Sequence, residues 1–139
     1  MGIAYAHVGR NLTVTVWHRE VTADEWRDQV ERLGAELREQ PRRLFLTDIR
    51  SATVVSTIDD EQIVEMADSF ARDVAGVSDV RVALVAGSLF EGATTFEVET
   101  TADGIRTFVF ADPEIACVWL GAATDEVLPA VSKLRQSLT

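Results

Sequence analysis

The chain has 139 residues, of which 47% are hydrophobic, a size and composition typical of one ordinary domain with a sizeable core. Its formal net charge of −10 argues against nucleic acid and anionic membrane surfaces as partners, because both require a basic face and the positive charges here are scattered. No stretch approaches the roughly 18 to 20 apolar residues of a membrane span, no signal peptide opens the chain, and the lone Cys117 cannot form an internal disulfide. We therefore expect one cytoplasmic domain over residues 1–139.

The chain opens with two short apolar stretches that predict a β-hairpin. Residues 3–8 and 11–17 have strand character, and Gly9 and Arg10 lie where a tight reversal falls. Aliphatic and mixed side chains alternate along the second strand, as expected near a sheet edge, and such an edge could pair with another chain as a homodimer. His7 and His18 are expected to be half-exposed strand residues, and Trp17 is expected to be buried; an exposed Trp17 would instead be a binding anchor.

The first helix and the strand after it have the clearest patterns. Trp26, Val30, Leu33 and Leu37 recur at helical spacing, Thr22 and Glu25 form a capping-box signature, and Pro41 closes the segment. A nearly continuous apolar run over residues 44–49 then predicts a buried central strand, followed by a polar corner. Beyond the corner, residues 63–74 carry the apolar face of a second helix. The acids at 59–61 precede that face and are expected to favour its N-terminal dipole rather than bind metal.

The rest of the chain predicts alternating strands and helices. Residues 80–86 form the strongest buried strand, and 105–110 form the last one. Residues 89–103 have both strand-like alternation and helical spacing; we expect a helix, because parallel strands need a crossover of about a dozen residues. Asp112 followed by Pro113 predicts the start of a short helix whose apolar face is Ile115, Val118 and Trp119, and a final helix begins near residue 124. The order implies an α/β fold with a mixed, mostly parallel sheet of about five strands and flanking helices.

A candidate site follows from this arrangement, because functional crevices in parallel α/β sheets lie beyond the C-terminal ends of the strands. The residues that the predicted strands bring to this edge are Asp48, Arg50, Ser51, Ser56, Thr57, Gly87, Ser88 and Asp112. Helix N-termini at this edge could also bind an anion. Ser56, Thr57, Ser88 and Asp112 are expected to be N-caps, which does not prevent a second role. No complete catalytic motif or metal-ligand set is present, and both histidines are expected away from this edge, so we expect neither an enzyme nor a cofactor.

The order of elements resembles the anti-sigma-factor antagonist fold, the STAS domain, and in particular the SpoIIAA-like, or STAS/Sec14-like, group. The resemblance covers nearly the whole chain and is most specific in LFEGATTFEVETTADGIRTFVFADPEIACVWLG, where seven positions match the group's pattern: Gly92, Phe96, Glu97, Phe110, Trp119, Leu120 and Gly121. Antagonists of this group are phosphorylated on a serine or threonine at the start of the helix after the central strand. The resemblance places Ser56 and Thr57 there, with Ser56 and Ile58 where the family motif has aspartate and glycine.

The resemblance implies a non-enzymatic regulatory module that binds a protein partner, such as an anti-sigma factor or a kinase, through the surface from Ser51 to Asp60. Thr57 or Ser56 would be the phosphoacceptor. The alternative is a Sec14-like domain whose pocket accepts a small apolar or anionic molecule. A deep apolar pocket opening near Gly87 and Asp112 would favour the ligand, whereas a shallow convex surface with exposed Thr57 would favour the partner.

Overall fold

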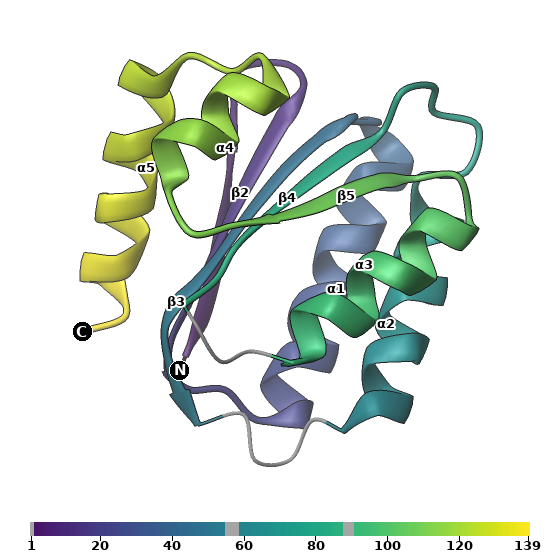
Figure 1. The fold of residues 1–139 in the computed structure, drawn as a ribbon, viewed down its shortest axis with the longest axis horizontal. Helices are drawn as coiled ribbons and strands as arrows, with labels where there is room; N and C mark the ends of the chain where they lie inside the picture. The colour runs from purple at the N-terminus through teal and green to yellow at the C-terminus, as the bar shows by residue number, and fades with distance from the viewer. Residues whose placement is uncertain (1, 55–58, 88–90) are drawn as a thin grey trace.

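The computed structural model describes residues 2–54, 59–87 and 91–139. Five strands form one sheet in the order β1-β2-β3-β4-β5, with β1 antiparallel to β2 and every other pair parallel (Figure 1). The predicted fold class, a mixed and mostly parallel sheet with flanking helices, is confirmed. The elements in chain order are β1 (Ile3–Val8), β2 (Leu12–Glu20), α1 (Ala23–Glu39), β3 (Leu44–Val54), α2 (Asp60–Asp73), β4 (Arg81–Val85), α3 (Glu91–Ala102), β5 (Arg106–Phe110), α4 (Pro113–Leu120) and α5 (Thr124–Ser137).

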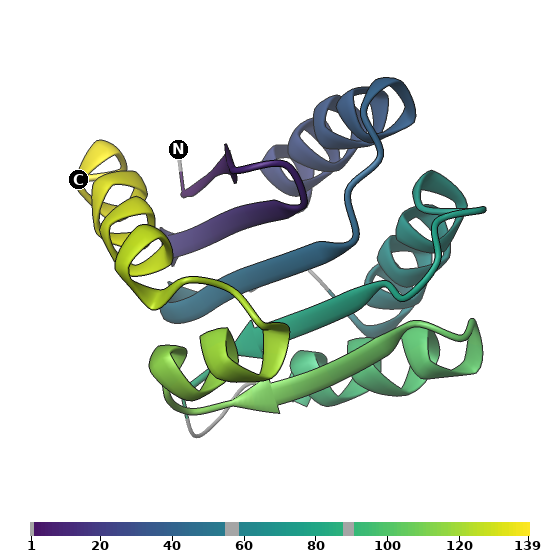
Figure 2. The same ribbon diagram turned by 90° about the horizontal axis from the view of Figure 1, so that it is seen from above.

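Helices cover both faces of the sheet, so the core has two parts. Helices α1, α2 and α3 lie on one face, and α4 and α5 lie on the other (Figures 1 and 2). The central strand β3 contributes Phe45 and Ile49 to the first part and Leu44 and Leu46 to the second, because successive strand residues point to opposite faces. This is why its sequence is apolar almost without interruption, as predicted for a buried central strand.

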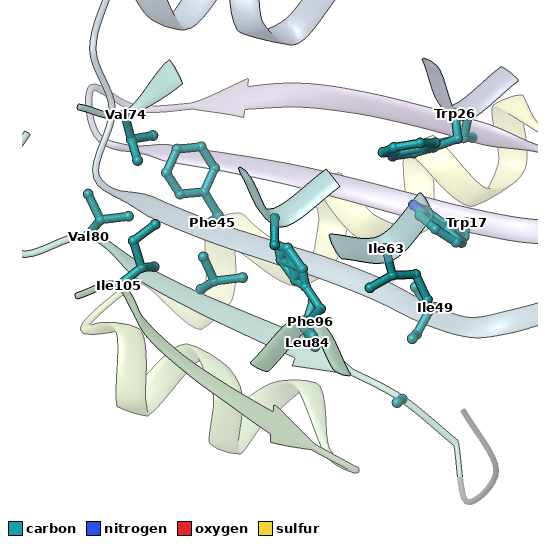
Figure 3. Close-up of a cluster of buried hydrophobic side chains, with 14 of the residues drawn as sticks. Trp17, Trp26, Phe45, Ile49, Ile63, Val74, Val80, Leu84, Phe96 and Ile105 are labelled. Carbon is teal, nitrogen blue, oxygen red and sulfur yellow. The ribbon is translucent and has the colours of Figure 1, made fainter. Parts of the chain in front are cut away.

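The larger part of the core contains two of the three tryptophans. Figure 3 shows Trp17 and Trp26 at one end of this cluster and Val74 and Val80 at the other. Both tryptophans are buried, with 6% and 4% of their surface exposed. The expectation that Trp17 is buried is confirmed, so Trp17 is not an exposed binding anchor.

Local signals fix several helix ends as expected. The Thr22 hydroxyl accepts a hydrogen bond from the Glu25 backbone N–H at 3.2 Å, and Asp112 Oδ1 accepts one from the Glu114 N–H at 2.8 Å. Gly121 ends α4 in the left-handed conformation, with φ of 72°. The reciprocal half of the predicted capping box is wrong, because the Glu25 carboxylate accepts from the Gly2 N–H instead and attaches α1 to the chain before β1.

Three further expectations need correction. Strand β2 reaches Glu20 and lies between β1 and β3, so the edge strand of the hairpin is β1. Strand β3 runs on to Val54, so the polar corner predicted after residue 49 lies within a strand. In α4 the buried face is Ala116, Cys117 and Leu120, whereas Ile115 and Val118 are exposed.

Candidate functional site

The register of the parallel strands aligns three predicted site residues at one edge of the sheet. Asp48 in β3 lies beside Val85 in β4, which lies beside Phe110 in β5. Two residues further along the chain from each of these come Arg50, Gly87 and Asp112, so these three lie in a row across the sheet just past the ends of β4 and β5, whereas β3 continues to Val54. We call this row the C-terminal edge. Gly87 and Asp112 are exposed, and the Arg50 side chain is one-third exposed.

Asp48 does not face solvent at this edge; its carboxylate is fully buried beneath it. Arg50 binds both carboxylate oxygens, from Nε to Oδ1 at 2.9 Å and from Nη2 to Oδ2 at 2.8 Å, and its backbone N–H also donates to Oδ1 at 3.0 Å. Arg135 of α5 donates from Nη2 to Oδ2 at 2.6 Å. A buried carboxylate needs such partners, because transfer of an unpaired charge out of water is costly. Asp48 therefore holds Arg50 in place and ties α5 to the sheet.

Arg50 is the member of this network that reaches the surface. Its hydrogen bond to Asp48 raises the pKa of its guanidinium, burial acts in the opposite direction, and the negative charges of Asp48 and Asp112 raise the pKa further. Arg50 therefore presents a permanent positive charge, oriented by Asp48, at one end of the row, with the exposed Gly87 and Asp112 following it across the sheet. The cationic Arg50 and the anionic Asp112 could each form a hydrogen bond or ion pair with a bound molecule.

Arg135 was not predicted as a site residue. The signal was present in the final helix, where Val127 and Val131 are buried and Arg135 continues the same series four residues later. A positive charge on an inward-facing helical stripe needs a buried negative partner. The sequence alone did not identify that partner as Asp48, which is 87 residues away.

Ser51 lies at the same edge, and its neighbour in β2 is His18. The expectation that His18 lies away from this edge is wrong, because β2 is parallel to β3 and extends far enough to reach it. Neither ring nitrogen of His18 has a hydrogen-bond partner among the described residues, so His18 and Ser51 do not form a nucleophile–base pair. His7 lies at the other end of the sheet, where its Nδ1 lies 2.9 Å from Thr13 Oγ1.

Asp59 is the N-cap of α2. Its Oδ1 accepts from the Gln62 backbone N–H at 2.9 Å, and the Gln62 side chain accepts from the Asp59 N–H at 2.9 Å, which completes a capping box. The expected capping role of the acids at 59–61 thus falls to Asp59. Ser56, Thr57 and Ser88 lie outside the described residues. Since α2 is capped by Asp59, neither Ser56 nor Thr57 is its N-cap.

A cavity of about 130 Å³ lies on the face of the sheet that α1, α2 and α3 cover, between α1, α2 and the strands. Its lining is mainly apolar and includes Trp17, Trp26, Phe45, Ile63, Phe70 and Phe96. Gln29 of α1 also lines it, and its Oε1 is buried with no hydrogen-bond partner among the described residues. Gly87 and Asp112 do not line this cavity, so it is separate from the C-terminal edge.

Comparison with known proteins places this architecture in a known class, the α/β fold of anti-sigma-factor antagonists. One solved structure, of the anti-sigma factor antagonist SpoIIAA in its unphosphorylated form, matches with a TM-score of 0.59 and 15% sequence identity. The match covers 87% of this chain and 99% of that chain, so the chain has a SpoIIAA-like, or STAS, fold. No family model and no curated protein matches the sequence.

Metal-binding clusters and membrane-spanning helices are both absent from the described part of the chain. In residues 2–54, 59–87 and 91–139, no three or more His, Cys, Asp or Glu side chains are grouped so that they could hold a metal ion. No helix in these ranges is long and apolar enough to cross a membrane.

Proposed function

We propose that residues 1–139 act as one cytoplasmic, non-enzymatic regulatory domain that binds a protein partner through the C-terminal edge. The binding surface comprises Arg50, Ser51, Asp59, Gly87 and Asp112. The observation that carries the proposal is the row of Arg50, Gly87 and Asp112 across β3, β4 and β5 of a SpoIIAA-like fold. A protein of that fold is described as an anti-sigma factor antagonist, which supports an anti-sigma factor or a kinase as the type of partner.

The chemistry of the row supports contact with a protein. Asp48 fixes the Arg50 guanidinium before any partner arrives, so less side-chain entropy is lost when Arg50 binds. Gly87 adds no side chain between the two charged residues, so a partner backbone can approach closely. Asp112 supplies an exposed acceptor beside the cationic Arg50. A partner that places an acidic group against Arg50 and a basic group against Asp112 would complement this surface.

The regulatory part of the proposal concerns Thr57, with Ser56 as the alternative phosphoacceptor. These residues precede the α2 cap, Asp59, by two and three positions. A phosphate there would be attracted by the N-terminus of α2 and repelled by Asp59 and Asp60, so phosphorylation would change the charge of the surface. Intact-mass measurement of protein expressed in its native host tests this part. If wild type and Thr57→Ala never differ by a phosphate, Thr57 is not the acceptor.

The partner surface is tested by blocking it at Gly87. A side chain at Gly87 meets no atom within 4 Å of its Cβ, so Gly87→Arg adds bulk without disturbing the fold. Asn11→Arg is the matched control, because Asn11 is exposed at the opposite end of the sheet. In affinity purification from the native host, Gly87→Arg should lose the partner that wild type and Asn11→Arg retain. Equal capture by all three proteins would contradict the proposed surface.

The cavity favours a second candidate function, the binding of a small apolar molecule. An apolar cavity of about 150 Å³ in another protein remains dry and binds benzene, and the cavity here is of similar size. The unpartnered Gln29 Oε1 is a hydrogen-bond acceptor in a mainly apolar lining. A ligand with a six-membered ring and one donor, such as phenol, would satisfy it. Phenol should therefore bind more tightly than benzene. The variant Val30→Phe, which fills the cavity, should bind neither molecule. Equal binding of both molecules to both proteins would exclude the cavity as a binding site.

A further inference from the structure

Several large apolar side chains are exposed around one edge of the sheet. Among the described residues, the large apolar side chains that are exposed come from α3, β5 and α4 only: Val98, Phe108, Val109, Ile115 and Val118. Half of Phe108 and three-quarters of Val118 are exposed. Figure 2 shows β5 at the rim of the sheet, on the side away from the N-terminus. Apolar groups clustered in this way mark an interaction site more often than scattered ones do.

The same edge has unpaired backbone groups. Strand β5 ends the strand order, so within the described residues it has a strand neighbour on one side only. The Arg106 N–H donates to Val80 O at 3.2 Å, and Phe110 O accepts from the Ala86 N–H at 2.9 Å. Even-numbered residues of β5 therefore direct their backbone groups toward β4. Thr107 and Val109 direct theirs outward, where another strand could pair with them.

The sequence around this edge is complementary to itself. Residues 106–112 read RTFVFAD. A phenylalanine lies on each side of Val109, and the two ends of the segment carry opposite charges, Arg106 and Asp112. If two copies meet antiparallel with Val109 opposite Val109, Phe108 lies opposite Phe110 and Arg106 lies opposite Asp112, each pair occurring twice. We propose that β5 pairs with β5 of a second copy in this register to form a homodimer with a continuous sheet.

The backbone geometry agrees with this register. A residue whose N–H and C=O both point outward must lie in a hydrogen-bonded pair of an antiparallel ladder, and Val109 is such a residue. Phe108 and Phe110 then form the closer, non-hydrogen-bonded pairs, in which cross-strand aromatic contacts are favourable. Both rings already lie against Trp119, at centroid distances of 5.2 and 5.6 Å, so the contact extends an existing aromatic cluster.

Arg106 and Asp112, at the two ends of this segment, can each form a hydrogen bond in addition to the one they already make. Arg106 is hydrogen-bonded to Asp79 through Nη2, and its other N–H groups can donate to a partner; 58% of the side chain is exposed. Asp112 uses Oδ1 for the α4 cap, and its Oδ2 can accept. The net charge of −10 on each copy opposes association, and salt screens that repulsion over about 8 Å at physiological ionic strength. We expect the dimer to be clearest at moderate salt.

Sedimentation of the full chain across a concentration series tests the dimer. Val109→Pro removes an N–H that faces solvent in the monomer, and proline is tolerated at such edge positions, so the monomer fold is kept while the pairing is lost. Val109→Thr keeps the N–H and is the matched control. Wild type and Val109→Thr should dimerise, and Val109→Pro should raise the dissociation constant about tenfold or more, equivalent to about 1.4 kcal/mol. A monomeric wild type, or a dimer unaffected by Val109→Pro, would overturn the proposal.

A charge exchange tests the register itself. Arg106→Glu alone and Asp112→Lys alone each place like charges opposite one another and should weaken the dimer, whereas the double variant restores opposite pairs and should recover it. The loss of the α4 cap is common to Asp112→Lys and the double variant, so recovery reports the cross-strand contact. A double variant weaker than both single variants would refute the register.

Discussion

The buried network around Asp48 gives a prediction that depends on how many bonds each arginine makes. Arg135→Met removes one charged hydrogen bond to Oδ2 and leaves Asp48 with three bonds from Arg50. Arg50→Met removes two charged bonds and leaves only Arg135 and a backbone N–H. Both variants replace an arginine by methionine. The difference between their free energies of unfolding therefore reports how much each arginine stabilises the buried Asp48 carboxylate.

The expected magnitudes follow from burial. A hydrogen bond between charged groups contributes about 1.5–3 kcal/mol when it is shielded from water. Because Arg135 is 32% exposed, solvent screening reduces its value, and we expect Arg135→Met to cost about 1–2 kcal/mol. Arg50→Met should cost about 2–4 kcal/mol, since Asp48, which has no exposed surface, then lacks most of its compensation.

Urea unfolding followed by circular dichroism measures both costs. Adding Asp48→Asn to Arg50→Met should recover part of the loss, because a neutral amide is less costly to bury than an underpaired carboxylate. The proposed stabilising role of the two arginines is refuted if both variants lie within about 0.5 kcal/mol of wild type, the range of ordinary surface substitutions. It is also refuted if Arg135→Met proves the more damaging of the two.

Three further predictions concern other parts of the chain. Burial, with a smaller contribution from Arg42, lowers the pKa of His7 below 6.5 although Glu36 lies 3.5 Å from its Nε2, so the unfolded chain binds a proton more readily and stability should fall as pH drops below about 6.5. His7→Gln should flatten this part of the pH profile. Burial raises the pKa of the Cys117 thiol, so iodoacetamide should modify it only at the rate of unfolding; fast alkylation of the native protein would contradict this. Thr100→Val should cost about 1–3 kcal/mol, because it leaves the buried Thr107 hydroxyl without its 2.6 Å partner, and adding Thr107→Val should recover most of the loss.

Helix positions and caps could be predicted from the sequence because their signals are local. The caps Thr22 and Asp112 each lie two or three residues from the N–H that they accept from. The buried face of α4 could not be chosen in this way. Ile115 and Val118 have helical spacing, but so do Ala116 and Leu120, so the spacing alone does not choose between the two faces. The face with Ala116, Cys117 and Leu120 is buried, because α4 turns that face toward the sheet, where it contacts β4.

The site was harder to predict because it depends on the register between distant segments. Asp48 and Arg50 were identified as site residues, but Asp48 is buried because β3 continues beyond it and because α5 places Arg135 over it. His18 lies beside Ser51 only because β2 is longer than its alternating pattern indicated. Side-chain periodicity carries no information on such pairings, since it describes one segment at a time.

The central claim, that a protein partner binds at the C-terminal edge, is tested most directly by photo-crosslinking in the native host. A photoreactive amino acid at Gly87 probes the edge, and one at Asn11 probes the opposite end of the sheet. We expect a crosslinked partner protein from position 87 and none from position 11. A partner that crosslinks from position 11 but not from position 87 would contradict it.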